Sequence, residues 1–221
     1  MNTDTLPEDA DPFCLSPDAA SGLLASAPWR RYASIGDSLS AGTGDASPGY
    51  RDGGWPDRLA AHLRSVRPEL AYLNTAVVGA TTEDTLRTQL DRALAFEPDL
   101  LHLPCGANDL LRRTPDFDAI ARSLRVLYDR AATTGATLTT FTLSSAYVVP
   151  VFPDWCDRIQ RLNALVRAIA AAYDAVLVDM EDHPVKFRDD LLSADRIHFA
   201  GVGQAVLASE MVRALARRLT Q

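Results

Sequence analysis

The sequence alternates between short apolar runs and longer segments with helical periodicity, and this alternation constrains the fold more than any other feature. A chain of this pattern favours right-handed βαβ units, which give a parallel sheet with helices on both faces. Side-chain periodicity and capping residues predict where the elements lie. The predicted strands cover residues 32–35, 70–78, 100–103, 136–143 and 175–178, and the predicted helices cover 55–66, 82–94, 117–131, 155–173 and 204–219.

The starts of several helices carry capping signals. Ser16-Pro17-Asp18 reads as an N-cap, a proline at the first helical position and an acid in the first turn, and Pro28 ends this short helix. Thr82 and Asp116 are the expected N-caps of two later helices. No repeat or low-complexity linker interrupts the pattern. We therefore predict an N-terminal arm with a short helix over residues 1–28 and a single α/β domain over residues 29–221.

Composition and charge narrow the class of protein. The chain has 221 residues, of which 47% are hydrophobic and 23% charged, so it can bury one sizeable core. The formal net charge is −7 and there is no basic run. Electrostatics therefore gives no basis for binding nucleic acid or an anionic membrane, and we expect neither partner. The oligomeric state cannot be derived from these features.

The cysteines and the N-terminal residues indicate in which cellular compartment the protein is expected. Cys14, Cys105 and Cys156 are an odd number at wide spacing, which argues against a disulfide framework and favours a reducing compartment. Residues 1–10 lack the basic and apolar regions of a secretory signal, and no apolar stretch is long enough to span a bilayer. We expect a cytoplasmic protein. The four histidines show no ligand spacing, so we expect no metal and no cofactor.

Polar and small residues follow several of the predicted strands. Ser38 follows the first strand, Gly79 the second and Asn108 the third, while Asp195 and His198 come before the last helix. In an open parallel sheet, functional groups lie beyond the carboxyl ends of the strands. These residues are therefore expected to converge at one edge of the sheet.

This set matches the needs of nucleophilic catalysis. A serine hydroxyl attacks well only when a base takes its proton, and histidine titrates near neutral pH. Asp195 lies three residues before His198, close enough to fix the imidazole tautomer. The backbone N–H groups of Ser38 and Gly79 and the side-chain amide of Asn108 could then donate to an oxyanion.

Four segments together resemble the conserved blocks of the SGNH/GDSL hydrolases. They occur in the family's order and span residues 33 to 198. Position 76 is alanine where the second block often has glycine, which would affect packing beside the oxyanion hole. The segments are Ala33-Ser34-Ile35-Gly36-Asp37-Ser38-Leu39-Ser40, Asn74 to Thr82, Gly106-Ala107-Asn108-Asp109 and Asp195-Arg196-Ile197-His198.

The resemblance implies both a fold and an activity. The implied fold is a flavodoxin-like three-layer α/β/α sandwich with five parallel strands in the order 2-1-3-4-5. The implied activity is hydrolysis of carboxylic esters or thioesters through an acyl-enzyme on a small-molecule substrate. By resemblance, Ser38, Asp195 and His198 form the catalytic triad, and Ser38, Gly79 and Asn108 form the oxyanion hole.

Other interpretations remain open at this stage. Ser38 alone would be an ordinary turn residue after Gly-Asp. His183 is the only rival base, since His102 falls within a strand and reads as a core histidine. An acyltransferase would use the same acyl-enzyme with an alcohol or amine acceptor, and a catalytically silent binding module would keep the fold alone. Asp109 reads as a helix cap or a brace.

Loops that follow the strands should build the substrate pocket. We expect contributions from residues 41–54 with Tyr50 and Arg51, and from residues 110–115. Residues 144–154 are apolar and aromatic, and they suggest a partly apolar acyl site. The apolar residues in question are Tyr147, Val148, Val149, Val151 and Phe152.

Overall fold

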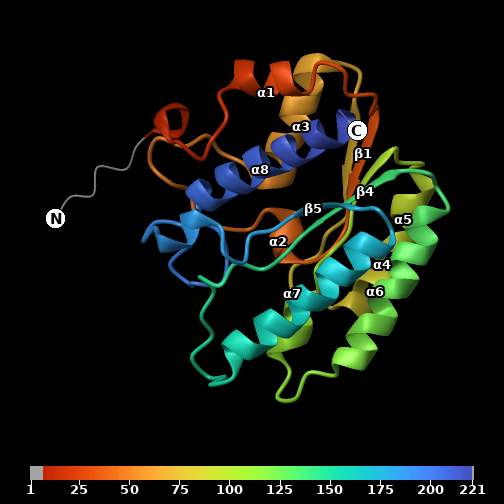
Figure 1. The fold of residues 1–221 in the computed structure, drawn as a ribbon, viewed down its shortest axis with the longest axis vertical. Helices are drawn as coiled ribbons and strands as arrows, with labels where there is room; N and C mark the ends of the chain where they lie inside the picture. The colour runs from red at the N-terminus through yellow and green to blue at the C-terminus, as the bar shows by residue number, and fades with distance from the viewer. Residues whose placement is uncertain (1–6, 221) are drawn as a thin grey trace.

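Five parallel strands form the centre of the protein, shown as a computed structural model whose described residues are 7–220 (Figure 1). Their order across the sheet is β2-β1-β3-β4-β5, which confirms the predicted order. Tyr32 in β1 pairs with Tyr72 on one side and Leu100 on the other. The strands are β1 (Arg31–Ser34), β2 (Ala71–Asn74), β3 (Leu100–His102), β4 (Thr137–Phe141) and β5 (Val176–Val178).

Helices cover both faces of the sheet, so the predicted three-layer architecture is confirmed. One layer holds α1, α3 and α8, which pack on one another, and the other holds α4 to α7 (Figure 1). The first layer is α1 (Pro17–Leu23), α3 (Trp55–Val66) and α8 (Gly201–Leu219). The second is α4 (Thr82–Thr88), α5 (Leu90–Ala95), α6 (Phe117–Ala132) and α7 (Trp155–Ala172).

Short helical turns occupy several loops. The helix α2 (Ser38–Ala41) lies at the carboxyl end of β1, and the 3-10 turns are Glu8–Ala10, Ala107–Leu111 and Pro184–Phe187. None of these was predicted as an element. These segments have three to five residues, too few to show a helical period in the sequence. Among residues 7–220, no helix combines the length and apolar character needed to cross a bilayer.

Capping side chains begin half of the α-helices of residues 7–220, namely α1, α2, α4 and α6. The Ser16 side chain accepts from the Ala19 N–H, and Asp116 accepts from the Ala119 N–H, as predicted. The prediction of Thr82 as a cap was wrong by one residue. Thr81 is the N-cap, because its side chain and that of Asp84 form a reciprocal capping box.

The second strand is shorter than predicted. The sequence suggested a strand over 70–78, but β2 ends at Asn74, whose side chain accepts from the Ala76 N–H and turns the chain out of the sheet. Val77 and Val78 are 53% and 64% exposed in the loop that follows. These two apolar residues are therefore open to solvent and do not belong to the core.

The described part of the N-terminal arm is attached to the body by buried charges. Glu8 and Asp11 are 6% and 4% exposed. Glu8 pairs with Arg58 at 2.9 Å and also with Arg51, while Asp11 pairs with Arg188. Helix α1 packs against α3 and α8. Residues 1–6 of the predicted arm and residue 221 lie outside the described residues.

Candidate active site

Ser38 is placed by a tight turn between β1 and α2. Gly36 has φ +141°, a conformation that side chains rarely allow. A Cβ at this position would lie 2.4 Å from Ser40 Oγ and 3.1 Å from Pro104 Cβ. Glycine is therefore required here, and the turn places Ser38 as the first residue of α2.

A buried glutamine fixes the peptide that precedes this turn. Gln89 is 1% exposed; its Oε1 accepts from the Gly36 N–H and its Nε2 donates to the Gly36 carbonyl, both at 2.8 Å. It lies at the break between α4 and α5. Gln89 was not predicted as a site residue from the sequence. The available signal was a lone polar residue among the apolar positions Leu86, Leu90 and Ala93.

Asp37 caps the short helix that carries Ser38. Its carboxylate accepts from the Leu39 N–H at 2.9 Å, and the residue is 3% exposed. Burial raises the pKa of Asp37 to about 6, despite the hydrogen bonds that favour its charged form. The side chain therefore has a structural role in the turn.

This raised pKa predicts a pH-dependent stability. The folded state holds the Asp37 proton more tightly than the unfolded state, so its stabilising effect is full below about pH 4 and is lost as pH rises through about 6. We expect Asp37→Asn to match wild type near pH 4 and to exceed it at pH 7 by up to about 3 kcal/mol in free energy of unfolding. Chemical denaturation at several pH values measures this difference.

Asp84→Asn supplies a control of opposite sign. Hydrogen bonds from Thr81 hold the pKa of Asp84 below its ordinary value. Its stabilising effect is therefore present above the unfolded pKa and is lost as pH falls, so this variant should be less stable than wild type at pH 7. A difference between Asp37→Asn and wild type that stays constant from pH 4 to 7 would contradict the assignment to Asp37.

Asp195 and His198 share one short hairpin. Leu192 and Phe199 form an antiparallel bridge, and the Ser193 N–H donates to the His198 carbonyl at 2.8 Å. Within the hairpin, Asp195 Oδ1 accepts from the N–H groups of Ile197 and His198 at 2.9 and 3.1 Å. The carboxylate is thus oriented by its own loop before it meets the imidazole.

A continuous chain of hydrogen bonds joins the three predicted catalytic side chains. His198 Nε2 lies 2.8 Å from Ser38 Oγ, and His198 Nδ1 lies 2.6 Å from Asp195 Oδ2. Burial alone would raise the pKa of Asp195, but hydrogen bonds from His198 and Ile197 outweigh it and hold the pKa below its ordinary value. The ionised carboxylate can only accept, so Nδ1 carries the proton and Nε2 is free to accept from Ser38. Ser38 is 7% exposed.

The loop after α2 holds the hairpin in place. Asp45 Oδ2 accepts from the Ala194 N–H at 2.9 Å, and the Asp45 N–H donates to Ser193 Oγ at 2.8 Å. At Gly44, a Cβ would lie 1.8 Å from the Phe199 carbonyl oxygen, so the two loops are in close backbone contact. The position of His198 therefore depends on residues 44–45, whose contact with the hairpin we did not predict from the sequence.

The predicted oxyanion residues lie on adjoining loops. Asn108 Nδ2 donates to the Ala80 carbonyl at 3.1 Å, which ties it to the segment of Gly79. Gly79 has φ +82° and is exposed. Asp109 is the brace expected from the sequence, since its two oxygens accept from the Thr82 N–H and hydroxyl at 2.9 and 3.0 Å.

The remaining histidines lie away from this chain of hydrogen bonds. His183 Nδ1 accepts from the Val185 N–H, and its ring packs on Phe13 of the N-terminal arm. His102 is fully buried against Trp55 and Phe141, and burial lowers its pKa to about 3. Its Nε2 has no partner among the described residues, so the core histidine is only half satisfied.

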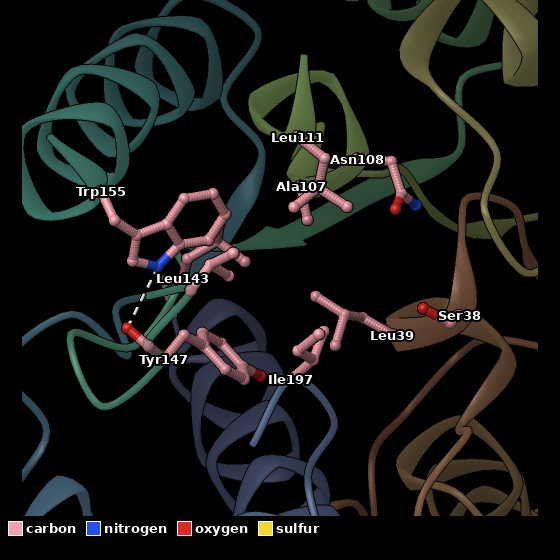
Figure 2. Close-up of a pocket in the computed structure, with 10 residues that line it drawn as sticks. Ser38, Leu39, Ala107, Asn108, Leu111, Leu143, Tyr147, Trp155 and Ile197 are labelled. Carbon is pink, nitrogen blue, oxygen red and sulfur yellow. Dashed lines mark hydrogen bonds between the residues drawn. The ribbon is translucent and has the colours of Figure 1, made fainter. Parts of the chain in front are cut away.

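An apolar pocket adjoins Ser38 (Figure 2). The predicted loop 144–154 contributes Tyr147 and Val149. The loop 41–54 does not line it as expected: Tyr50 donates to Asp11 and Arg51 pairs with Glu8, because the buried acids of the arm attract them. Within residues 7–220, no cluster of metal-ligating side chains occurs. The lining residues are Ser38, Leu39, Ala107, Asn108, Leu111, Leu143, Tyr147, Val149, Trp155 and Ile197.

Solved structures share this fold. An acetylxylan esterase from Geobacillus stearothermophilus superposes with a TM-score of 0.68 at 22% identity, over 84% of this chain and 94% of the other. A psychrotrophic esterase from Pseudoalteromonas gives 0.67 at 21% identity, over 87% of this chain and 100% of that one. An α/β hydrolase from the metagenome of Lake Arreo, Spain, gives 0.68 at 22% identity, over 84% and 94%. These likenesses confirm the fold.

Sequence comparison gives the family. No curated protein matches the chain significantly. The family model described as GDSL-like Lipase/Acylhydrolase family matches residues 34–206. This range includes the loops of Ser38, Gly79 and Asn108 and the hairpin of Asp195 and His198. The chain therefore belongs to the GDSL-like lipase/acylhydrolase family and is an esterase.

Proposed function

We propose that this esterase cleaves carboxylic esters through an acyl-enzyme on Ser38, with His198 as general base and Asp195 as its partner. The observation that carries the proposal is the unbroken chain from Ser38 Oγ through His198 to the Asp195 carboxylate, at 2.8 and 2.6 Å. The distances lie in the range that proton transfer between a nucleophile and its base requires.

The geometry supports a two-step reaction. Ser38 Oγ attacks the carbonyl carbon while its proton moves to His198 Nε2, and the imidazolium that forms is stabilised by Asp195. His198 then gives that proton to the departing alcohol oxygen as the C–O bond breaks. A water molecule then attacks the acyl-enzyme and gives a proton to His198 Nε2. His198 returns that proton to Ser38 Oγ as the bond between Oγ and the acyl carbon breaks, and the carboxylic acid is released.

The oxyanion is assigned to three donors. Ser38 is the first residue of α2, so its backbone N–H has no acceptor within the helix. Among the hydrogen bonds of residues 7–220, none uses the N–H of Ser38 or Gly79. The Asn108 amide donates one hydrogen to the Ala80 carbonyl, and its second hydrogen is available to donate to the oxyanion. These groups support a hole built from Ser38, Gly79 and Asn108.

Covalent labelling tests the proposal. The Pseudoalteromonas esterase was crystallised inhibited by monoethylphosphonate, which marks a phosphonate as a suitable probe. With a p-nitrophenyl ethylphosphonate, intact mass should show one added phosphonyl group, and peptide mapping should place it on Ser38. Asn108→Ala should slow this labelling by roughly 10²- to 10³-fold, because the phosphonyl oxygen loses a donor in the transition state.

Ser40 is the matched control for labelling. It lies two residues further along α2 and is also buried, but among the hydrogen bonds of residues 7–220 none joins it to His198. Ser40→Ala should therefore label at the wild-type rate. Labelling that persists in Ser38→Ala, or that maps to another residue, would show that Ser38 is not the nucleophile.

A further inference from the structure

The apolar pocket beside Ser38 ends at an aromatic wall. Figure 2 shows Ser38 and Asn108 at one end and Trp155 with Tyr147 at the other. The sides between them are aliphatic, and no charged side chain of residues 7–220 lines the pocket. The aliphatic lining comes from Leu39, Ala107, Leu111, Leu143, Val149 and Ile197.

The pocket is small. Its volume is about 40 Å³. A cavity needs about 10–15 Å³ to hold one water molecule, so only a short acyl chain fits between Ser38 and Trp155.

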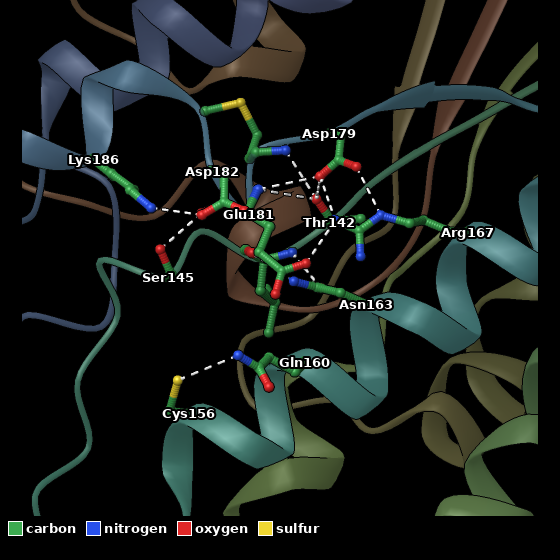
Figure 3. A network of polar contacts seen from close by, with 12 residues as sticks. Thr142, Ser145, Cys156, Gln160, Asn163, Arg167, Asp179, Glu181, Asp182 and Lys186 are labelled. Atoms are coloured by element: carbon green, nitrogen blue, oxygen red, sulfur yellow. Dashed lines mark hydrogen bonds and ion pairs between the residues drawn. The ribbon is translucent and has the colours of Figure 1, made fainter.

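A larger groove lies behind the wall. It has a volume of about 370 Å³ and shares Tyr147, Val149 and Trp155 with the pocket. These three side chains therefore separate the two spaces. Part of the groove is apolar, with Phe152 and Ile159, and its polar side is formed by side chains seen in Figure 3, namely Ser145, Cys156, Gln160, Glu181 and Asp182.

Trp155 is held firmly in this wall. Its indole Nε1 donates to the Tyr147 carbonyl at 3.1 Å, and its ring stacks on Phe152 with 6.1 Å between centroids. The guanidinium of Arg158 lies 4.2 Å from the Phe152 ring centroid, and Arg158 is itself buried and bonded to the Leu110 carbonyl at 2.7 Å. Arg158 thus connects the aromatic wall to the loop after β3, which contains Leu110.

We infer that Trp155 is the residue that limits acyl chain length, so that the enzyme takes esters of short, uncharged acyl groups. This inference rests on the function proposed above. The leaving alcohol must depart next to His198 Nε2 to receive its proton, and His198 does not line the pocket. The acyl chain therefore occupies the apolar pocket and meets Trp155 at its end.

The test compares chain-length profiles. We measure kcat/KM for p-nitrophenyl butyrate and octanoate with wild type, Trp155→Ala and Trp155→Leu. Wild type should prefer butyrate by at least about tenfold, since each misfitted methylene costs about that factor or more. Removal of the indole joins the pocket to the groove, so the octanoate-to-butyrate ratio should rise by at least about tenfold in Trp155→Ala, with a smaller rise in Trp155→Leu.

Two features keep this test decisive. The ratio for two esters does not depend on the fraction of enzyme that is folded, so a loss of stability in the variants does not alter it. Val151→Ala is the matched control. The sequence analysis placed Val151 in the acyl site, but this was wrong, because Val151 is 76% exposed in the loop 144–154 and lines neither space. The ratio for this variant should equal that of wild type.

Each other outcome has a definite meaning. An unchanged ratio in both Trp155 variants, or a wild type that hydrolyses octanoate as well as butyrate, overturns the inference and leaves the role of Ser38 intact. Turnover that survives in Ser38→Ala contradicts the proposed nucleophile instead. The labelling rates of ethyl and octyl phosphonates give the same ratio without turnover, and failure of wild type to react with either esters or phosphonates contradicts both proposals.

Discussion

Replacing Ser38 with alanine should lower kcat for p-nitrophenyl acetate by roughly 10⁴- to 10⁶-fold. The methyl group cannot form the acyl-enzyme, and His198 is left with no proton to accept at the 2.8 Å contact. Any remaining rate would come from the oxyanion donors acting on direct attack by water. Steady-state kinetics on both proteins under identical conditions give the value.

The control for this prediction is again Ser40→Ala, which should retain the wild-type kcat. Thermal unfolding of both variants would verify that each is folded. Equal rates for Ser38→Ala and wild type would rule out serine catalysis at this position.

Replacing Asp195 with asparagine should lower kcat by roughly 10³- to 10⁴-fold while leaving the hairpin folded. Asparagine can keep one oxygen on the N–H groups of Ile197 and His198, as Asp195 Oδ1 does now. Its amide nitrogen would then face His198 Nδ1, which becomes an acceptor. The imidazole proton moves to Nε2, and Nε2 can no longer take the proton of Ser38.

Two measurements distinguish this tautomer effect from simple damage. Nitrogen-15 NMR of His198 should show the proton on Nδ1 in wild type and on Nε2 in Asp195→Asn. Asp182→Asn, which alters a carboxylate that pairs with Lys186 on the surface, should keep the wild-type kcat. A loss of less than about tenfold in Asp195→Asn, with the tautomer changed, would mean that the carboxylate contributes little to catalysis.

The pattern of residues along the sequence was sufficient to predict the layers and the convergence of Ser38, Asp195 and His198 at one edge of the sheet. Period and caps report local structure, and the parallel sheet brings strand ends to one edge. The strand order itself came from the resemblance to a family, since alternation alone does not determine which strands are neighbours.

The features that the sequence did not predict depend on long-range contacts. Gln89 lies 53 residues from Gly36, and Asp45 lies 149 residues from Ala194. Neither residue belongs to a motif, so only the folded chain identifies them as supports of the site. Tyr50 and Arg51 were wrongly predicted to line the pocket for the same reason, because their partners are in the N-terminal arm.

Asp195 and His198 are neighbours on one hairpin, whereas Ser38 lies 160 residues away along the chain. The acid–base pair can therefore form locally, but its contact with the nucleophile exists only after β1 and β5 have both joined the sheet and the hairpin that follows β5 has packed beside α2. Contacts of such wide sequence separation are costly in chain entropy and form late. A partly folded chain, such as one still being synthesised, consequently has no assembled nucleophile–base pair. Esterase activity therefore appears only when the whole sheet has formed.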